Sequence, residues 1–159
     1  MPVYSLKIKA ELEEIAKMSV TEGVMWKFDI QSGEGGDSKS GITVTASDVM
    51  ELDGSKGEAN FIVKWPGSKM QSYIKVLETK AGAAEYTAEK SGEWVTIANF
   101  ECRGLEIVSY IPGADFKAES TGGTIFEAVD LSEGDWAEYD EENELAVSIM
   151  NLEHMVMKA

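Results

Sequence analysis

The chain contains one thiol and one imidazole, Cys102 and His154, so a cysteine nucleophile activated by a histidine base is the first chemistry to test. Nothing in the sequence places the two residues together. Strand alternation puts Cys102 on the same face as Phe100, which favours a buried and inert thiol. His154 lies among methionines in the last predicted strand, where packing or a hydrogen bond is the expected role. We therefore predict no catalytic residues and no enzyme activity.

A glycine-rich segment at 32–37, reading SGEGGD, carries two carboxylates, Glu34 and Asp37. Oxygen donors of this kind attract calcium or magnesium, but two carboxylates fall well short of the shell of six to eight oxygens that calcium needs. The spacing of the glycines also lacks both nucleotide-binding fingerprints and a following Lys-Ser/Thr. We expect a solvated turn, and weak metal binding by Glu34 and Asp37 stays open.

An acidic run at 133–144, reading EGDWAEYDEENE, lacks the spacing of a calcium-binding loop. We expect it to be a solvated loop. Trp136 and Tyr139 lie inside it, and exposed aromatic residues surrounded by charge are typical anchors for a protein partner. Both residues are therefore candidates for partner binding.

Arg103 is the single arginine of a chain with 29 acidic residues. Its planar guanidinium suits a two-pronged bridge to a carboxylate. The structural interpretation is a bridge to Glu101, Glu106 or an acidic loop residue, which would fix a bend at Gly104. The functional interpretation is recognition of a carboxylate on a partner.

Two stretches of sequence, NFECRGLE at 99–106 and TGGTIFEAVDLSEGDWAEYD at 121–140, resemble the eukaryotic CXXC-motif-containing zinc-binding proteins. The resemblance is weaker around 3–12 and Trp26, and weakest in the middle of the chain. It implies a small all-β fold without catalytic residues. It also implies one zinc site built from two CXXC pairs, which supply four thiolates.

The resemblance places these two pairs at SGEG (32–35) and WPGS (65–68), so the four ligand positions are Ser32, Gly35, Trp65 and Ser68. None of these side chains is a useful zinc ligand. We therefore predict that the structural zinc site has been lost and that no cofactor is bound.

The lost zinc requires compensation, since a structural zinc can contribute on the order of 10 kcal/mol to folding. Pro66 and Gly67 are suited to the two central positions of a type II turn, which would close the second hairpin without a metal. Trp65 either covers the other hairpin tip or is an ordinary core residue.

Composition limits the class of partner. The net charge of −15 repels nucleic acid and anionic membranes, which leaves a protein partner, possibly a basic one. A single cysteine and the lack of an N-x-S/T triplet favour a reducing compartment, and no apolar run is long enough for a signal peptide or a spanning helix. We expect a cytoplasmic monomer.

Period-two hydrophobic patterns predict an all-β fold of about nine or ten short strands in two packed sheets or a barrel. Together with the family resemblance, which implies a complex β-sandwich, the expected fold is a complex β-sandwich or split barrel. We expect one domain over 1–159, a long connection at 80–92 and two weak helical segments, at 83–88 and within 130–139. The predicted strands cover Leu6–Ala10, Lys27–Gln31, Ile42–Thr45, Asn60–Trp65, Tyr73–Leu77, Trp94–Glu101, Leu105–Ile111, Thr124–Val129 and Leu145–Met157.

A possible internal repeat lays Ile8–Ile15 over Phe100–Ile107, which would make two pseudo-twofold halves unless the similarity is chance. The function that best fits all of this is a non-catalytic protein-interaction module. A metal-handling role, like that of the zinc-binding relatives, is the alternative.

Overall fold

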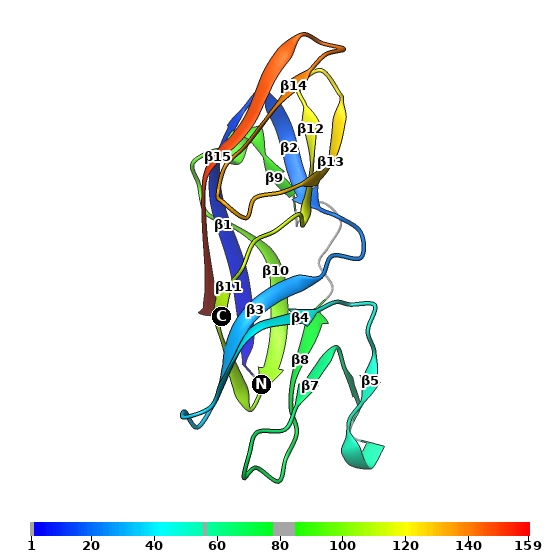
Figure 1. Ribbon diagram of the computed structural model, residues 1–159, viewed down its shortest axis with the longest axis vertical. Coiled ribbons are helices and arrows are strands. Elements are labelled where there is room, and N and C mark those ends of the chain that lie inside the picture. Colours follow the sequence, from blue (N-terminus) through cyan, green and yellow to red (C-terminus); the bar gives the residue numbers. More distant parts are fainter. Residues whose placement is uncertain (1, 56, 78–84) are drawn as a thin grey trace.

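The computed structural model describes residues 2–55, 57–77 and 85–159, and its regular structure is almost entirely β. The largest sheet has six antiparallel strands in the order β14-β15-β1-β10-β8-β7. Two of these strands, β1 and β15, form the long spine of the molecule in Figure 1. The bounds are β14 (Trp136–Asp140), β15 (Leu145–Lys158), β1 (Val3–Glu13), β10 (Val95–Arg103), β8 (Ser72–Leu77) and β7 (Phe61–Val63).

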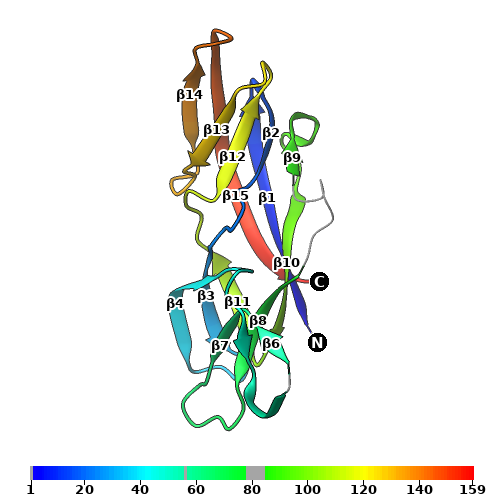
Figure 2. The same ribbon diagram turned by 90° about the vertical axis from the view of Figure 1, so that its right-hand side faces the viewer.

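Two smaller sheets lie towards opposite ends of this spine (Figure 2). One has the order β11-β3-β4, and the other has the order β13-β12-β2-β9. Their strands are β11 (Leu105–Tyr110), β3 (Trp26–Ser32), β4 (Ser38–Val44), β13 (Ile125–Val129), β12 (Phe116–Ser120), β2 (Ile15–Val20) and β9 (Glu85–Thr87). A short ribbon of β5 (Met50–Glu51) and β6 (Glu58–Ala59) and two 3-10 turns, η1 (Asp53–Ser55) and η2 (Ala88–Lys90), complete the regular structure of the described residues.

The two halves of the chain are related by a pseudo-twofold rotation. The rotation exchanges β1 with β10, β15 with β8 and β14 with β7, so the six-stranded sheet has the same order when it is read from its other edge. It also exchanges β11 with β2, β3 with β12 and β4 with β13, which converts the sheet β11-β3-β4 into the β2-β12-β13 part of the four-stranded sheet. Each half also has a sharp corner at a residue with positive φ, Glu14 (54°) between β1 and β2 and Gly104 (75°) between β10 and β11. The prediction of two halves is therefore confirmed. Its alignment was wrong, because Glu14 corresponds to Gly104, whereas the predicted overlay placed Leu12 there.

The main core lies between the six-stranded sheet and the two smaller sheets. Alternation along β1, β3 and β10 turns apolar residues inwards, which is the half-buried strand pattern that the sequence predicted. Phe28 and Phe100 meet edge to face with ring centroids 5.0 Å apart, and Trp26 and Tyr110 pack around them. This aromatic group fixes the end of the molecule that carries β3, β4 and β11.

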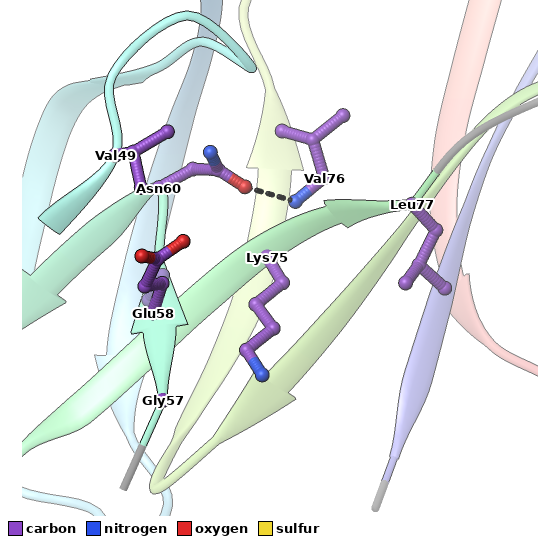
Figure 3. Close-up of a pocket in the computed structure, with 8 residues that line it drawn as sticks. Val49, Gly57, Glu58, Asn60, Lys75, Val76 and Leu77 are labelled. Carbon is purple, nitrogen blue, oxygen red and sulfur yellow. Dashed lines mark hydrogen bonds between the residues drawn. The ribbon is translucent and has the colours of Figure 1, made fainter. Parts of the chain in front are cut away.

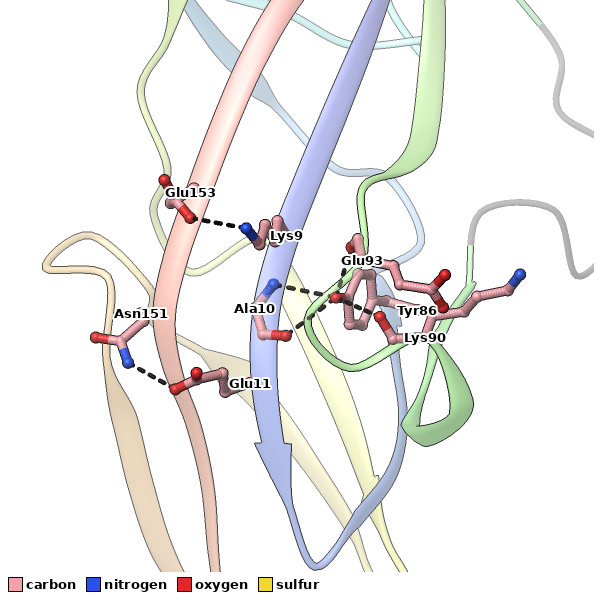
Figure 4. A network of polar contacts seen from close by, with 8 residues as sticks. All are labelled: Lys9, Ala10, Glu11, Tyr86, Lys90, Glu93, Asn151 and Glu153. Atoms are coloured by element: carbon pink, nitrogen blue, oxygen red, sulfur yellow. Dashed lines mark hydrogen bonds and ion pairs between the residues drawn. The ribbon is translucent and has the colours of Figure 1, made fainter.

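A second fixed point is the phenol of Tyr86, which is fully buried at β9. Its hydroxyl accepts the Ala10 N–H (3.1 Å) and lies 2.8–3.0 Å from the carbonyl oxygens of Ala10, Lys90 and Glu93 (Figure 4). The Gly92 N–H donates to Ala10 O in addition. These bonds attach the segment at 86–93 to the middle of β1, where β10 no longer pairs with it.

The weak helix predicted at 83–88 is wrong in the described residues, because Glu85–Thr87 is strand β9. The long connection predicted at 80–92 is also wrong from residue 85 on, where it holds β9 and η2; residues 78–84 lie outside the described residues. The helical turn predicted within 130–139 is wrong, since that range has a non-helical turn at 132–133 and then β14. The acidic segment at 133–144 is therefore not simply a loop, because β14 (Trp136–Asp140) lies inside it and is followed by a turn at 141–144. Strands β2 and β12 were also missed. In the described part of the chain, neither helical turn approaches the length and apolar character of a membrane-spanning helix.

Candidate binding site at the hairpin tips

The loop between β3 and β4 is a tight, glycine-dependent turn. Ser32 N–H donates to Asp37 O (2.8 Å), and Gly35 N–H donates to Ser32 O (2.9 Å). Gly35 and Gly36 have φ of 81° and 91°, a region that side chains rarely occupy, so glycine is needed at both positions. This loop presents Glu34 and Asp37, both of which are exposed.

The loop between β7 and β8 begins with the turn Trp65-Pro66-Gly67-Ser68. Ser68 N–H donates to Trp65 O (3.0 Å), and Gly67 has φ of 80°. The type II turn predicted from Pro66 and Gly67 is therefore confirmed.

The corner at Gly104 joins these two loops. Its carbonyl oxygen accepts hydrogen bonds from Gly33 N–H and from Ser72 Oγ, each at 3.1 Å. One backbone carbonyl therefore holds a residue of the β3–β4 loop and the first residue of β8, where the other loop ends. The close approach explains the glycine, because a Cβ at 104 would lie 2.3 Å from Ser72 Oγ.

The two loops and the corner enclose a cavity of about 600 Å³, which we call the tip hollow. It is lined by 32–35, Asp37, 65–72, Arg103 and Gly104. All four positions that the resemblance assigned to zinc, Ser32, Gly35, Trp65 and Ser68, face this one space. The lining contains no thiol and no imidazole. Across the described ranges, no three His, Cys, Asp or Glu residues gather closely enough to hold a metal ion.

Trp65 is the unusual member of the lining. It is 5% exposed and belongs to the main core, which agrees with the alternative of an ordinary core residue, and it also contributes to the lining of the hollow. Its indole Nε1 has no hydrogen-bond partner, and within the described residues it is the sole buried side-chain N or O atom in that state. A buried donor without an acceptor costs about 1–3 kcal/mol, which offsets part of the free energy that burial of the ring contributes.

Arg103 lies exposed on the rim of the hollow, and its side chain makes no ion pair or hydrogen bond to any residue that the structure describes. The predicted bridge to Glu101 or Glu106 is therefore wrong. Glu101 lies 3.8 Å from Lys75 Nζ, and Glu106 accepts a hydrogen bond from Gln31 Nε2 at 2.8 Å. Lys69 stands on the same rim.

Two further depressions adjoin this end of the molecule. One of about 180 Å³ shares Lys69, Met70, Gln71 and Arg103 with the tip hollow, so the two cations stand between both spaces. The other is a shallow trough between β6 and β8, where Asn60 Oδ1 accepts the Val76 N–H at 2.8 Å (Figure 3).

Cys102 and His154 do not form a pair. Cys102 is fully buried, and burial raises the pKa of its thiol to about 12, so it is protonated at neutral pH. His154 lies opposite Ile8, and Ile8 lies opposite Val95, which is roughly 20 Å along β10 from Cys102 at about 3.3 Å per residue. The His154 ring packs edge-on against Tyr110, and burial lowers its pKa.

Trp136 and Tyr139 are not brought together either. They lie on opposite faces of β14, since successive side chains of a strand alternate. Trp136 is half-buried with its ring edge-on to Phe126 at 5.4 Å, whereas Tyr139 is 51% exposed beside Glu138, Glu141 and Glu142.

The opposite end of the molecule repeats the hydrogen-bond geometry of the tip hollow. Thr121 N–H donates to Glu14 O (3.0 Å), as Gly33 N–H does to Gly104 O. Ser120 N–H donates to Thr124 O and Gly123 N–H donates to Ser120 O, as Ser32 N–H and Gly35 N–H do in the β3–β4 loop. The loops at this end are joined by Asp140, which is 1% exposed and accepts hydrogen bonds from Ser120 Oγ (2.6 Å), Thr124 Oγ1 (2.9 Å) and Asn143 Nδ2 (2.9 Å). Burial raises the pKa of Asp140, but these bonds outweigh it and hold the pKa at about 2.

Sequence reasoning missed this network because its members are ordinary surface residue types spread over two hairpins. Only the strand order shows that the loops at 120–124 and 140–145 meet at the corner at Glu14.

Comparison with known proteins agrees with this architecture. The family described as "CXXC motif containing zinc binding protein, eukaryotic" matches residues 5–157. The human and bovine proteins named "CXXC motif containing zinc binding protein" are each 33% identical over 161 residues, covering 99% of both chains. A solved structure titled "Hypothetical protein from plasmodium falciparum" superposes with a TM-score of 0.93 at 34% identity, covering 99% of this chain and 100% of that one.

Proposed function

Since the chain belongs to the eukaryotic CXXC-motif-containing zinc-binding protein family, we propose that it is a non-catalytic protein-interaction module in which the family's zinc site has become an open binding hollow. The observation that carries this proposal is the tip hollow itself. The four expected ligand positions line it, yet they supply two hydroxyls, a glycine and an indole.

The arrangement of the other chemical groups favours a non-catalytic role. The one thiol is buried and protonated, and the one imidazole lies far from it. Arg103 and Lys69, which form no ion pair with a described residue, give the hollow a rim suited to a protein surface. Tyr139 at the other end offers a second, acidic contact surface suited to a basic partner. We propose that the module acts as a monomer in the cytoplasm.

Affinity capture with matched variants tests this function. Arg103→Gln and Tyr139→Ser each change one exposed contact, and Lys117→Gln on the exposed face of β12 serves as the control for loss of one positive charge. We expect the wild type and the Lys117 variant to retain the same bound protein, and one of the two contact variants to lose it. A chain that retains no protein under any condition contradicts the proposal.

A metal-handling role is the second candidate, because Glu34 and Asp37 line the same hollow as the former ligand positions. Two carboxylates would need further ligands from a partner to complete a metal site. Elemental analysis separates the two functions: about one metal ion per purified chain favours metal handling, and metal far below that amount favours the interaction module.

A further inference from the structure

We propose that the free edge of β15, from Glu153 to Lys158, is a strand-addition site for an extended, neutral or basic peptide segment of a partner protein. This inference rests on the proposed interaction function and adds to it a surface outside the tip hollow. In strand addition, a peptide pairs with the edge of an existing sheet through its main chain, and the side chains on both faces give selectivity.

The last third of β15 has a neighbouring strand on one side only. Strand β1 pairs with it as far as Lys158, whereas β14 pairs with it only as far as Ile149, at the end of the molecule away from the C-terminus (Figure 1). Leu152 N–H then donates to Gly134 O (2.9 Å). Beyond that bond, no residue that the structure describes forms a main-chain hydrogen bond with this side of β15.

The direction of the unpaired main-chain groups follows from the bonds on either side of them. Leu152 N–H points away from β1, and Ala159 N–H donates to Val3 O on β1 (2.7 Å). Alternate residues of an antiparallel strand direct their N–H and C=O groups to the same side, so those of His154 and Val156 point away from β1. These groups recur about every 6.8 Å along the strand, a spacing that another extended main chain matches.

The other sheet edges in the described part of the chain are protected, as edges must be to avoid unwanted pairing. Strands β7 and β9 have three residues each, and β5 and β6 have two. The pairing of β4 shifts its register beside Gly41 (φ 67°), and that of β13 shifts beside Ala128 (φ 54°). Strand β11 has a register shift at Val108, and β14 carries the exposed Glu138.

The edge of β15 lacks all of these protective features. Its pairing with β1 runs from Glu153 to Lys158 without a register shift. The four residues between these ends, at 154–157, include no lysine, carboxylate, proline or glycine. A regular, mainly apolar edge of this kind is the type that pairs with an added strand.

The side chains around the edge determine the kind of segment that fits. Met155 and Met157 lie on the outer face and are 36% and 42% exposed, while Val156 on the other face packs against the main core. The ring of His154 meets Tyr110 of β11 on that inner side. Aliphatic and β-branched side chains pack well beside such residues across a strand pair. The net charge of −15 disfavours an acidic segment.

The test follows the main-chain amides of β15 in ¹H–¹⁵N spectra of the full chain. In the free protein, the amides of His154 and Val156 should exchange with solvent faster than those of Met155 and Met157, which pair with β1. The probe is the peptide acetyl-Lys-Val-Thr-Val-Thr-Val-Lys-amide. Its control is the same peptide N-methylated at the central Thr-Val-Thr, which keeps the side chains but removes main-chain donors on both edges.

We expect the unmethylated peptide to shift the His154 and Val156 amides in a saturable manner and to slow their exchange, and the methylated peptide to do neither. Met155→Lys should weaken this binding about fivefold or more, since a lysine on an edge strand opposes pairing. The matched control is Met150→Lys. Met150 is 38% exposed on the same face, beside the part of the edge that the turn at 134–135 covers, so its replacement should leave binding unchanged.

Equal behaviour of the two peptides, or no response to either, overturns the strand-addition site. Amides of His154 and Val156 that exchange slowly in the free protein at every dilution overturn it as well, because the edge is then already paired within the chain. Slow exchange that is lost on dilution identifies a second copy as the occupant and overturns the proposal of a partner segment. In each of these cases, a captured protein that is lost with Arg103→Gln or Tyr139→Ser, but not with Met155→Lys, still supports the interaction module.

Discussion

At the scale of single residues, Trp65 combines a favourable ring with an unfavourable donor. Its ring belongs to the main core, while its buried Nε1–H has no acceptor among the residues that the structure describes. Replacing Trp65 by Ser removes the ring and should lower the free energy of unfolding by on the order of 3 kcal/mol. Trp65→Phe keeps most of the apolar area and removes the unsatisfied donor, so its cost should be clearly smaller. Urea unfolding measures both; equal costs would show that the donor is satisfied in solution.

Tyr86 presents the opposite case, a buried hydroxyl with several partners. Tyr86→Phe keeps the ring but leaves the buried Ala10 N–H without an acceptor, and deprives the carbonyls of Lys90 and Glu93 of a donor. We expect a loss of about 1–3 kcal/mol in the free energy of unfolding. Hydrogen exchange should show the loss locally, with faster exchange of the Ala10 amide. An unchanged rate at Ala10 in the variant would contradict the role assigned to this hydroxyl.

At the scale of elements, the corners between strands decide where the site forms. Gly104→Ala places a methyl group 2.3 Å from Ser72 Oγ at a φ of 75°, so it should cost about 2 kcal/mol or more in stability. The matching substitution at the other corner, Glu14→Gly, relieves a positive φ and should cost little, apart from the side-chain bond to Thr121. Thermal unfolding of the two variants tests this asymmetry. A tolerant Gly104 and a sensitive Glu14 would show that the corners are not equivalent in the way we describe.

Much of the strand pattern could be predicted from alternation, and β1, β3, β8, β10, β11 and β15 lie close to their predicted positions. Strand β2 was missed because no typical turn residue separates it from β1: Glu13 and Glu14 lead directly to Lys17 and Ser19. The corner between the two strands has a glutamate, Glu14, at a positive φ where a glycine would have indicated a turn. Strand β14 was missed because acidic residues occupy its exposed positions, and its stability comes from pairing with β15.

For the site, the turn at Pro66 and Gly67 could be predicted because turn chemistry is local. The lack of a partner for Arg103 among the described residues could not be predicted, because it depends on the cross-strand contacts of Glu101 with Lys75 and of Glu106 with Gln31.

The two loops at the tip hollow make a metal-based test of their geometry possible. Cysteines at Ser32, Gly35, Trp65 and Ser68 would all face one cavity, so the quadruple variant should bind zinc and gain stability from it. The φ of 81° at Gly35 predicts a strain of about 1–3 kcal/mol for cysteine there, which is well below the 10–16 kcal/mol of a structural zinc site. Zinc content and melting temperature with and without a chelator give the result. A folded variant that binds no zinc would show that the loops cannot bring four sulfurs together.

At the scale of the whole molecule, pseudo-twofold symmetry gives two corner sites with different contents. One end holds the open tip hollow with two cations that pair with no described residue, and the other end holds a network around Asp140. The same backbone arrangement therefore carries a hollow at one end and a hydrogen-bonded cross-link at the other. On our proposal that the zinc site at the hollow has been lost, the Asp140 network shows how such a corner is held together without a metal.

The Asp140 network leads to a prediction about acid. Hydrogen bonds hold the pKa of Asp140 at about 2, below the ordinary value near 3.8 that applies in the unfolded chain. A lowered pKa stabilises the fold fully above the unfolded value, and this contribution is lost as the pH falls from about 4 towards 2. Denaturant midpoints between pH 6 and 2.5 should therefore fall more steeply for the wild type than for Asp140→Asn, which lacks the titrating group. At pH 6 the variant should be the less stable protein, because an amide cannot accept all the hydrogen bonds that a carboxylate accepts from Ser120, Thr124 and Asn143. Parallel curves for the two proteins would mean that other carboxylates, and not this cross-link, govern acid unfolding.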